Sequence, residues 1–150
     1  MIVRRALFKD LDQLSGLFDA YRVFYKKPSD LASAKNFLEQ RFEQEDSMIF
    51  VCELEHQLLG FTQLYCSYSS VSLGRVFILN DLFVVEKNRN HGIGQKLITE
   101  AVNYGKSVGA VRMELSTERT NTKAQKLYKS MGWKENETFL SFEFSLVINT

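Results

Sequence analysis

The segment from Arg75 to Val85 places the strongest constraint on the fold, because nearly all of its residues are apolar and β-branched or aromatic. Such a run is typical of a central strand that is covered on both faces. A loop containing glycine follows it, and apolar residues then recur at helical spacing from Ile93 to Gly105. The middle of the chain is therefore predicted to be a buried strand, a glycine loop and a helix.

Strand and helix patterns continue on both sides of this unit. The order predicts a mixed sheet in an α/β fold, because a hairpin pattern is followed by a strand–helix–strand pattern, and it predicts one domain over residues 1–150. A further short strand is considered near Trp133. The other expected strands are Ile2–Ala6, Met48–Leu54, Leu58–Tyr68, a buried Ala110–Leu115 and a half-buried Leu140–Ile148. Three other helices are expected: one begins after a capping box at Asp10 and Gln13, one begins after an N-cap at Asp30, and one spans Asn121–Met131.

Composition and charge argue against several classes of protein. The formal net charge is only +1, so no overall field favours a nucleic acid or an anionic membrane. No run approaches the roughly 20 apolar residues of a membrane helix, and no signal peptide pattern opens the chain. Two cysteines without Cys-x-x-Cys spacing do not predict a metal site. We therefore expect a cytoplasmic protein with no metal, nucleic-acid partner or membrane.

The loop after Val85 has the character of an anion site. It is basic, and Gly92 and Gly94 open the next helix, where unpaired amide groups and the helix dipole favour phosphate. A dinucleotide motif would need a third glycine where Leu97 stands, and a Walker loop would need Lys after Gly94, where Gln95 stands. A tight turn that only joins strand to helix remains the alternative reading of this spacing.

A second motif decides between these readings. Residues 121–133 match the pattern Asn-x-x-Ala-x-x-Leu-Tyr-x-x-x-Gly-Trp, and Arg89, Gly92 and Gly94 match Arg-x-x-Gly-x-Gly. In this order and separation, the chain from about Asp81 to Trp133 resembles the Gcn5-related N-acetyltransferase (GNAT) superfamily. The run Leu79–Val84 is also similar to spermidine/spermine and histone acetyltransferases. The resemblance implies an acyl-CoA N-acyltransferase fold, a central mixed sheet flanked by about four helices.

The resemblance implies that acetyl-CoA is the co-substrate and that its acetyl group passes directly to a primary amine. The pyrophosphate would lie on the loop from Arg89 to Gly94. Backbone groups of the preceding strand would bind the pantetheine arm in a splay of the sheet and polarise the thioester carbonyl, and Asn121 would bond to the arm. The cofactor-binding residues expected on this basis are Leu82, Phe83, Val84, Arg89, Asn90, His91, Gly92, Ile93, Gly94 and Asn121.

Three residues are candidates for the catalytic site, although the asparagine among them cannot take a proton. The resemblance makes Tyr128 the general acid for the departing thiolate, although its position on an apolar helix face also suits a core aromatic. Asn80 and Asp81 interrupt an apolar strand, which is costly without partners. Polyamine enzymes commonly carry glutamate at the position of Asn80. Asp81 would face the opposite side of a regular strand, so it could be a base only through a bulge; a buried anchor, or water as proton relay, are the alternatives.

The acceptor site is predicted near the end of the first helix, at Tyr21, Arg22 and Tyr25, and near the end of the hairpin, at Tyr65 and Tyr68. The tyrosine rings could hold a cationic amine by cation–π contact. Packing in the core is the alternative, and it is slightly favoured for Tyr21. A polyamine-like small molecule or a protein lysine is the expected acceptor, and other small amines and amino acids remain open. A CoA-binding module that has lost catalysis and senses acyl-CoA is the alternative function, motivated by Asn80. The resemblance also suggests a homodimer.

Overall fold

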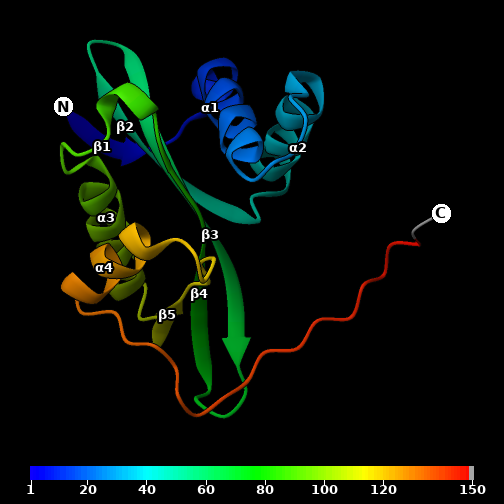
Figure 1. Ribbon diagram of the computed structural model, residues 1–150, viewed down its shortest axis with the longest axis vertical. Coiled ribbons are helices and arrows are strands. Elements are labelled where there is room, and N and C mark those ends of the chain that lie inside the picture. Colours follow the sequence, from blue (N-terminus) through cyan, green and yellow to red (C-terminus); the bar gives the residue numbers. More distant parts are fainter. Residues whose placement is uncertain (149–150) are drawn as a thin grey trace. The chain divides into compact units, whose positions relative to one another are not determined.

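The computed structural model describes residues 1–148 and contains a five-stranded mixed sheet in the order β1-β2-β3-β4-β5 (Figure 1). Neighbouring strands are antiparallel except β4 and β5, which are parallel. The mixed α/β architecture expected from the sequence is confirmed. The elements are β1 (Ile2–Arg5), η1 (Phe8–Asp10), α1 (Leu11–Phe24), α2 (Leu31–Gln44), β2 (Ser47–Leu54), β3 (Gln57–Ser69), β4 (Gly74–Val84), η2 (Glu86–Asn88), α3 (Ile93–Ser107), β5 (Arg112–Glu114) and α4 (Thr122–Ser130).

The chain forms two compact units. The first runs from Met1 to Ser116 and holds the whole sheet with α1, α2 and α3; the second begins at Thr117 and holds α4. A single domain over residues 1–150 stays a prediction. In the part of the chain that the structure describes, we find no helix with the length and apolar character needed to cross a membrane.

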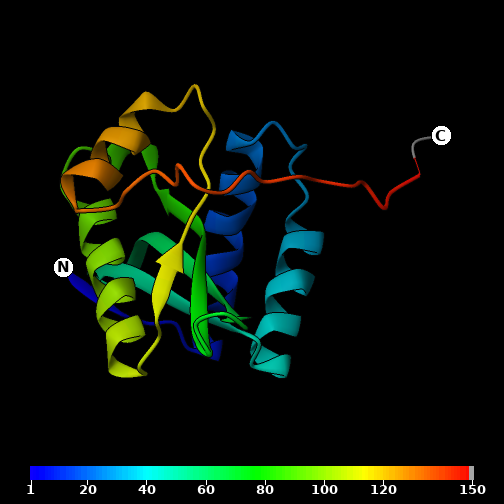
Figure 2. The ribbon, with the colours of Figure 1, turned by 90° about the horizontal axis from the view of Figure 1, so that it is seen from below.

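Helices cover both faces of the sheet in the first unit. Figure 2 shows α1 and α2 on one face and α3 on the other. The core under α1 and α2 contains Leu14, Leu38, Val51 and Phe61, which are fully buried, and this burial of apolar surface is the main stabilising contribution. The side chains of α3 that enter the core against the other face are Ile93, Leu97, Ile98 and Ala101.

The turn between the first strand and α1 differs from the predicted capping box. Asp30 does cap α2, because its carboxylate accepts a bond from the Ser33 amide at 3.1 Å. Asp10, however, accepts from the Leu7 amide at 2.8 Å and pairs with Arg4. Gln13 instead bonds the backbone of His56 and Leu58 in the β2–β3 turn, so the capping box at Asp10 and Gln13 was wrong.

The start of α3 approaches the sheet at Gly60 of β3. A methyl group built there would lie 2.7 Å from the Phe83 carbonyl oxygen, 3.3 Å from Leu97 Cδ1 and 3.4 Å from Ile93 Cγ2. Because only glycine leaves this space free, the N-terminus of α3 can lie close to the end of β4. The position of the glycine loop therefore depends on a residue more than 30 positions earlier in the chain.

Three strand predictions were wrong, the first of them only in part. The strand expected at Ala110–Leu115 is only Arg112–Glu114, and it is not buried, because it lies at the sheet edge with β4 as its one neighbour. Leu140–Ile148 forms no strand, and its apolar side chains, such as Phe142 and Phe144 at 88% and 89%, are exposed. Alternation of side chains specifies a strand only where a partner supplies backbone hydrogen bonds. The additional strand near Trp133 is not formed either.

Candidate active site

The strand β4 carries a β-bulge at Asn80. In the register with β3, Asp81 is opposite Gln63 and Leu79 is opposite Leu64, so Asn80 is the additional residue. The Asp81 carbonyl is fixed by the Thr62 hydroxyl at 2.7 Å. The bulge changes the strict alternation of side chains, and both Asn80 and Asp81 line one pocket. The bulge that Asp81 needs in order to face this pocket is therefore present.

Asp81 is a buried carboxylate held by neutral donors. Its side chain accepts hydrogen bonds from Gln63 Nε2 at 2.6 Å and from Asn80 Nδ2 at 2.9 Å, and the residue is only 3% exposed. The Ser47 hydroxyl donates to Gln63 Oε1 at 2.8 Å and so orients the amide. Burial raises the pKa of Asp81, and the bonds from Gln63 and Asn80 offset part of this rise. A carboxyl group with a raised pKa is suited to general-base chemistry.

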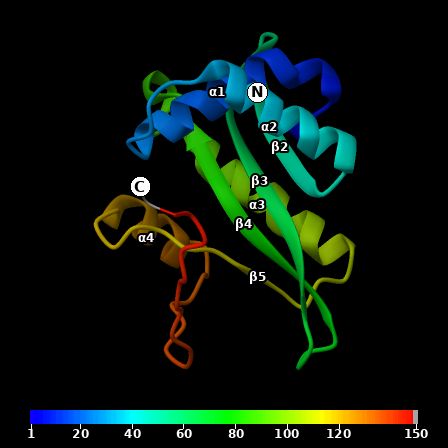
Figure 3. The same cartoon turned by 90° about the vertical axis from the view of Figure 1, so that its right-hand side faces the viewer.

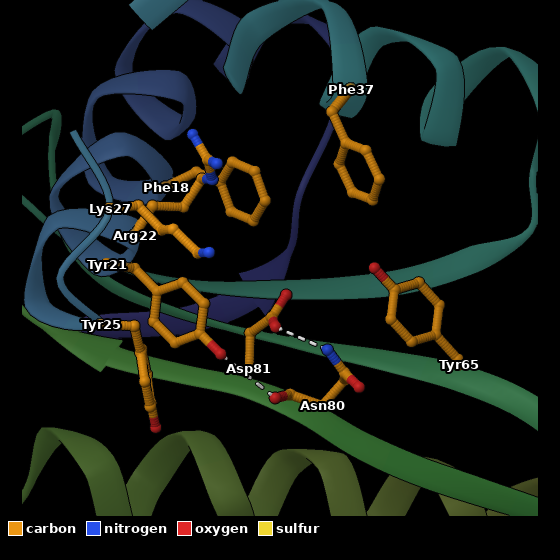
Figure 4. Close-up of a pocket in the computed structure, with 9 residues that line it drawn as sticks. All are labelled: Phe18, Tyr21, Arg22, Tyr25, Lys27, Phe37, Tyr65, Asn80 and Asp81. Atoms are coloured by element: carbon orange, nitrogen blue, oxygen red, sulfur yellow. Dashed lines mark hydrogen bonds between the residues drawn. The ribbon is translucent and has the colours of Figure 1, made fainter. Parts of the chain in front are cut away.

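The pocket above Asp81 has a volume of about 290 Å³ and aromatic walls (Figure 4). The Tyr21 hydroxyl donates to the Asn80 carbonyl at 3.3 Å, and Tyr21 packs edge-on against Tyr25 with ring centroids 5.1 Å apart. Burial and the charge of Asp81 raise the pKa of Tyr65 to about 12 and that of Tyr21 further, so both phenols stay neutral. The lining residues are Phe18, Tyr21, Arg22, Tyr25, Lys27, Phe37, Tyr65, Asn80 and Asp81.

Of the residues expected at the acceptor site, Tyr21, Arg22, Tyr25 and Tyr65 line this pocket together with Asn80 and Asp81. Tyr68 does not line it and is 72% exposed, so that prediction was wrong. Sequence reasoning missed Gln63, Phe37 and Lys27. A signal for Gln63 was present, since it is a lone amide in the apolar run Leu58–Leu64, on the strand paired with β4. The sequence has no comparable signal for Phe37, whose contact with the pocket depends on how α2 packs.

Within residues 1–116, the second half of β4 has no partner strand on its β5 side, and this edge is called the free edge of β4. Pairing of β5 with β4 ends at Ile78 and Glu114, and Figure 3 shows β5 beside only the first half of β4. The Val85 amide bonds to Leu59 of β3 at 2.9 Å, so in the alternating antiparallel ladder the backbone of Phe83 also faces β3. The backbone groups of Leu82 and Val84 consequently face the free edge. Of the three backbone positions expected to bind pantetheine, Leu82 and the amide of Val84 are open to a ligand, whereas the Val84 carbonyl already accepts a bond from Arg89 at 2.9 Å.

The glycine loop begins α3 with exposed backbone amide groups. Gly92 is the N-cap residue in the left-handed region at φ 78°, and it provides no side-chain cap. A methyl group built at Gly92 would meet nothing within 4 Å, so open space lies beside the loop. Asn90 is also left-handed at φ 67°, and Asn90 and His91 are exposed. The side chain of Ile93 is buried in the core, so only its backbone can contact a ligand.

Arg89 links the loop to β4. Its Nε donates to the Val84 carbonyl at 2.9 Å, and its guanidinium lies over the rings of Phe24 and Phe83, 5.7 and 5.4 Å from their centroids. These contacts hold a positive charge beside the loop. An unfilled helix N-terminus, an adjacent guanidinium and open space at Gly92 fit a pyrophosphate.

Asn121 and Tyr128 belong to the second unit. Asn121 is the N-cap of α4, and its Oδ1 accepts from the Ala124 amide at 3.1 Å. Tyr128 is half-buried and packs against Trp133 with ring centroids 6.0 Å apart. Both residues of the second motif therefore have a structural role within this unit, and their predicted roles toward coenzyme A stay predictions. No group of three potential metal ligands occurs among residues 1–148.

Comparison with known proteins agrees with this geometry. Residues 14–133 match the model of the acetyltransferase (GNAT) family. The chain is 42% identical over 142 residues to the uncharacterized N-acetyltransferase YhfO of Bacillus subtilis, covering 95% of each chain. It is 33% identical over 90 residues to the thialysine N-epsilon-acetyltransferase of Mus musculus, covering 58% of this chain and 52% of that one.

Solved structures give the same result. The crystal structure of a probable acetyltransferase, 38% identical, superposes with a TM-score of 0.94 and covers 99% of this chain and 100% of its own. The chain therefore belongs to the acetyltransferase (GNAT) family. It is an acetyl-CoA-dependent N-acetyltransferase, as the motifs around Gly92 and Tyr128 predicted. The finer similarity to histone and polyamine acetyltransferases stays a prediction.

Proposed function

We propose that the chain transfers the acetyl group of acetyl-CoA directly to the primary amine of a small molecule in the Asp81 pocket. The observation that carries this proposal is the bulge at Asn80, which directs a buried carboxylate into an aromatic pocket beside the free edge of β4. Asn80 cannot take a proton, but Asp81 can. The loss of glutamate at position 80 therefore no longer argues for a module that only senses acyl-CoA.

Two residues divide the proton transfers. The amine reacts in its neutral form, after its ammonium group has lost one proton to solvent. Asp81 takes the second proton from the nitrogen as the lone pair forms the bond to the carbonyl carbon. Tyr128 gives a proton to sulfur as the carbon–sulfur bond breaks, so the products are an acetamide and a free thiol. Asp81 then releases its proton to solvent and Tyr128 is reprotonated, which restores both groups. With these two proton transfers, the acetyl group passes directly to the amine and no covalent acyl-enzyme forms.

The coenzyme supplies the activated thioester and is held by backbone groups. The amides of α3 after Gly92, with Arg89, bind the pyrophosphate, and Asn90 and His91 add contacts from the exposed loop. Backbone groups of Leu82 and Val84 bind the pantetheine arm and the thioester oxygen. Asn121 completes the binding of the arm through its amide nitrogen, because its oxygen caps α4.

The acceptor is a primary amine that fits the pocket. A polyamine-like molecule and a protein lysine are the acceptors that the motif resemblance favours. The thialysine N-epsilon-acetyltransferase of Mus musculus supports a small amine, because its named substrate carries one. A homodimer and a cytoplasmic location stay part of this proposal.

The experiment is a thiol-release assay with acetyl-CoA and a panel of primary amines, with the acetylated product identified by mass spectrometry. We expect amine-dependent thiol release for at least one small amine. Stabilisation by coenzyme A without amine-dependent release would instead identify a binding module. Absence of both would contradict the loop assignment as well.

A further inference from the structure

The Asp81 pocket carries opposite charges on two walls. The carboxylate of Asp81 lies on the strand side, and Arg22 and Lys27 lie on the side of α1 and the segment that follows it (Figure 4). Arg22 is half-buried, so its guanidinium has lost part of its contact with water, whereas Lys27 is exposed at the rim. An occupant of this pocket therefore meets an anion at one end and two cations at the other.

Asp19 and Asp30 offset part of the charge of Arg22, but neither carboxylate forms a salt bridge with it. Asp19 and Asp30 are near enough for the charge of Arg22 to lower their pKa, but their oxygens accept bonds from neutral hydroxyl and amide groups at 2.6 to 3.1 Å. Within residues 1–148, neither Arg22 nor Lys27 forms an ion pair. This wall is therefore free to bind a negative group.

The middle of the pocket is apolar. Phe18 stacks on Phe37 with ring centroids 5.5 Å apart, and Tyr65 stands on the opposite side. A short aliphatic chain would bury its surface against these rings. The volume of about 290 Å³ lies at the lower end of the range for small-molecule sites, which favours a compact acceptor.

We propose that the acceptor is an amino carboxylate, with the reacting amine at Asp81 and the carboxylate at Arg22 and Lys27. This inference rests on the proposed function and names its substrate class. A polyamine would place its second positive charge against Arg22 and Lys27, where like charges repel. A carboxylate there forms charge-assisted hydrogen bonds with the guanidinium. The arrangement selects molecules in which an aliphatic chain separates the reacting amine from a carboxylate.

The test compares lysine with two analogues that differ only at the carboxylate: cadaverine, which lacks it, and lysinamide, which keeps its shape without the charge. The kcat/KM for each is measured by thiol release at saturating acetyl-CoA. A charge-assisted bond at this position predicts a kcat/KM for lysine that is about tenfold or more above both analogues. In the double variant Arg22→Gln/Lys27→Gln, the kcat/KM for lysine falls to that for cadaverine. The kcat/KM for cadaverine is not reduced by these substitutions.

Lys106→Gln is the matched control, since it removes an exposed positive charge on α3 outside the pocket and keeps the preference for lysine. Equal or better use of cadaverine by the wild type would overturn the inference, and so would an unchanged lysine preference in the double variant. Both results leave the proposed function standing, because amines are still acetylated. Failure to acetylate any amine would refute the proposed function and this inference together.

Discussion

Gln63 Nε2 donates a hydrogen bond of 2.6 Å to Asp81 Oδ2, and Ser47 fixes the other end of the Gln63 amide. This bond stabilises the ionised form of Asp81 against the effect of burial. Gln63→Met removes the donor while keeping an unbranched side chain of similar size. The pKa of Asp81 should then rise further, and the acid limb of the pH profile of kcat/KM should move to higher pH. If the acid limb of the pH profile does not shift, Asp81 is not the group that accepts the proton.

The raised pKa of Asp81 also predicts how stability depends on pH. Because the folded pKa lies above the unfolded value of 3.8, the folded state binds more protons than the unfolded state between these two values. The contribution of Asp81 to the free energy of unfolding is therefore largest below pH 3.8 and falls as pH rises through the folded pKa. Asp81→Asn should lose this dependence, and urea unfolding of both proteins at several pH values measures it.

Substitution at Gly92 tests the pyrophosphate loop. Gly92→Ala adds a methyl group into open space, but the left-handed backbone at φ 78° costs about 1–2 kcal/mol for a residue with Cβ. Gly92→Glu adds a negative charge where phosphate would bind. We expect coenzyme A affinity to fall modestly for Ala and beyond detection for Glu, by calorimetry. Equal affinity of the two variants would contradict the loop assignment.

The close approach at Gly60 should limit substitution there. Gly60→Ala places Cβ 2.7 Å from a backbone oxygen of β4, and overpacking of this kind costs about 1–3 kcal/mol. Gly16→Ala is the matched control, because nothing lies within 4 Å of its Cβ on α1, and it should stabilise the helix by up to about 1 kcal/mol. Thermal unfolding measures both. A neutral Gly60→Ala would show that α3 does not depend on this contact.

The sequence predicted most of the fold because strands β2, β3 and β4 and helices α1 to α3 have clear apolar periodicity. Its two motifs also predicted the acetyltransferase family. It could not decide whether Asp81 faces the pocket, because the bulge depends on the register between Gln63 on β3 and Asp81 on β4, and the pattern of apolar residues does not fix that register. The strand expected at Leu140–Ile148 was wrong because alternation alone does not supply a pairing partner.

Tyr128→Phe isolates the predicted general acid. The change removes one hydroxyl and keeps the ring that packs on Trp133, so the fold should persist. Turnover should fall by roughly 10²-fold or more, the contribution usual for acid catalysis. Tyr68→Phe, at a tyrosine that is 72% exposed, is the control. If both variants turn over like the wild type, sulfur takes its proton from elsewhere.

The Asp81→Asn variant tests most directly whether Asp81 accepts the proton of the amine. Glu100→Gln on α3 is the matched control. The two observables are amine-dependent turnover at saturating acetyl-CoA and the Kd for coenzyme A. Loss of a general base predicts a fall in turnover of about 10²-fold or more for Asp81→Asn, with an unchanged Kd and a normal control. Turnover of Asp81→Asn at the wild-type rate would contradict the assignment of Asp81 as the group that accepts the amine proton.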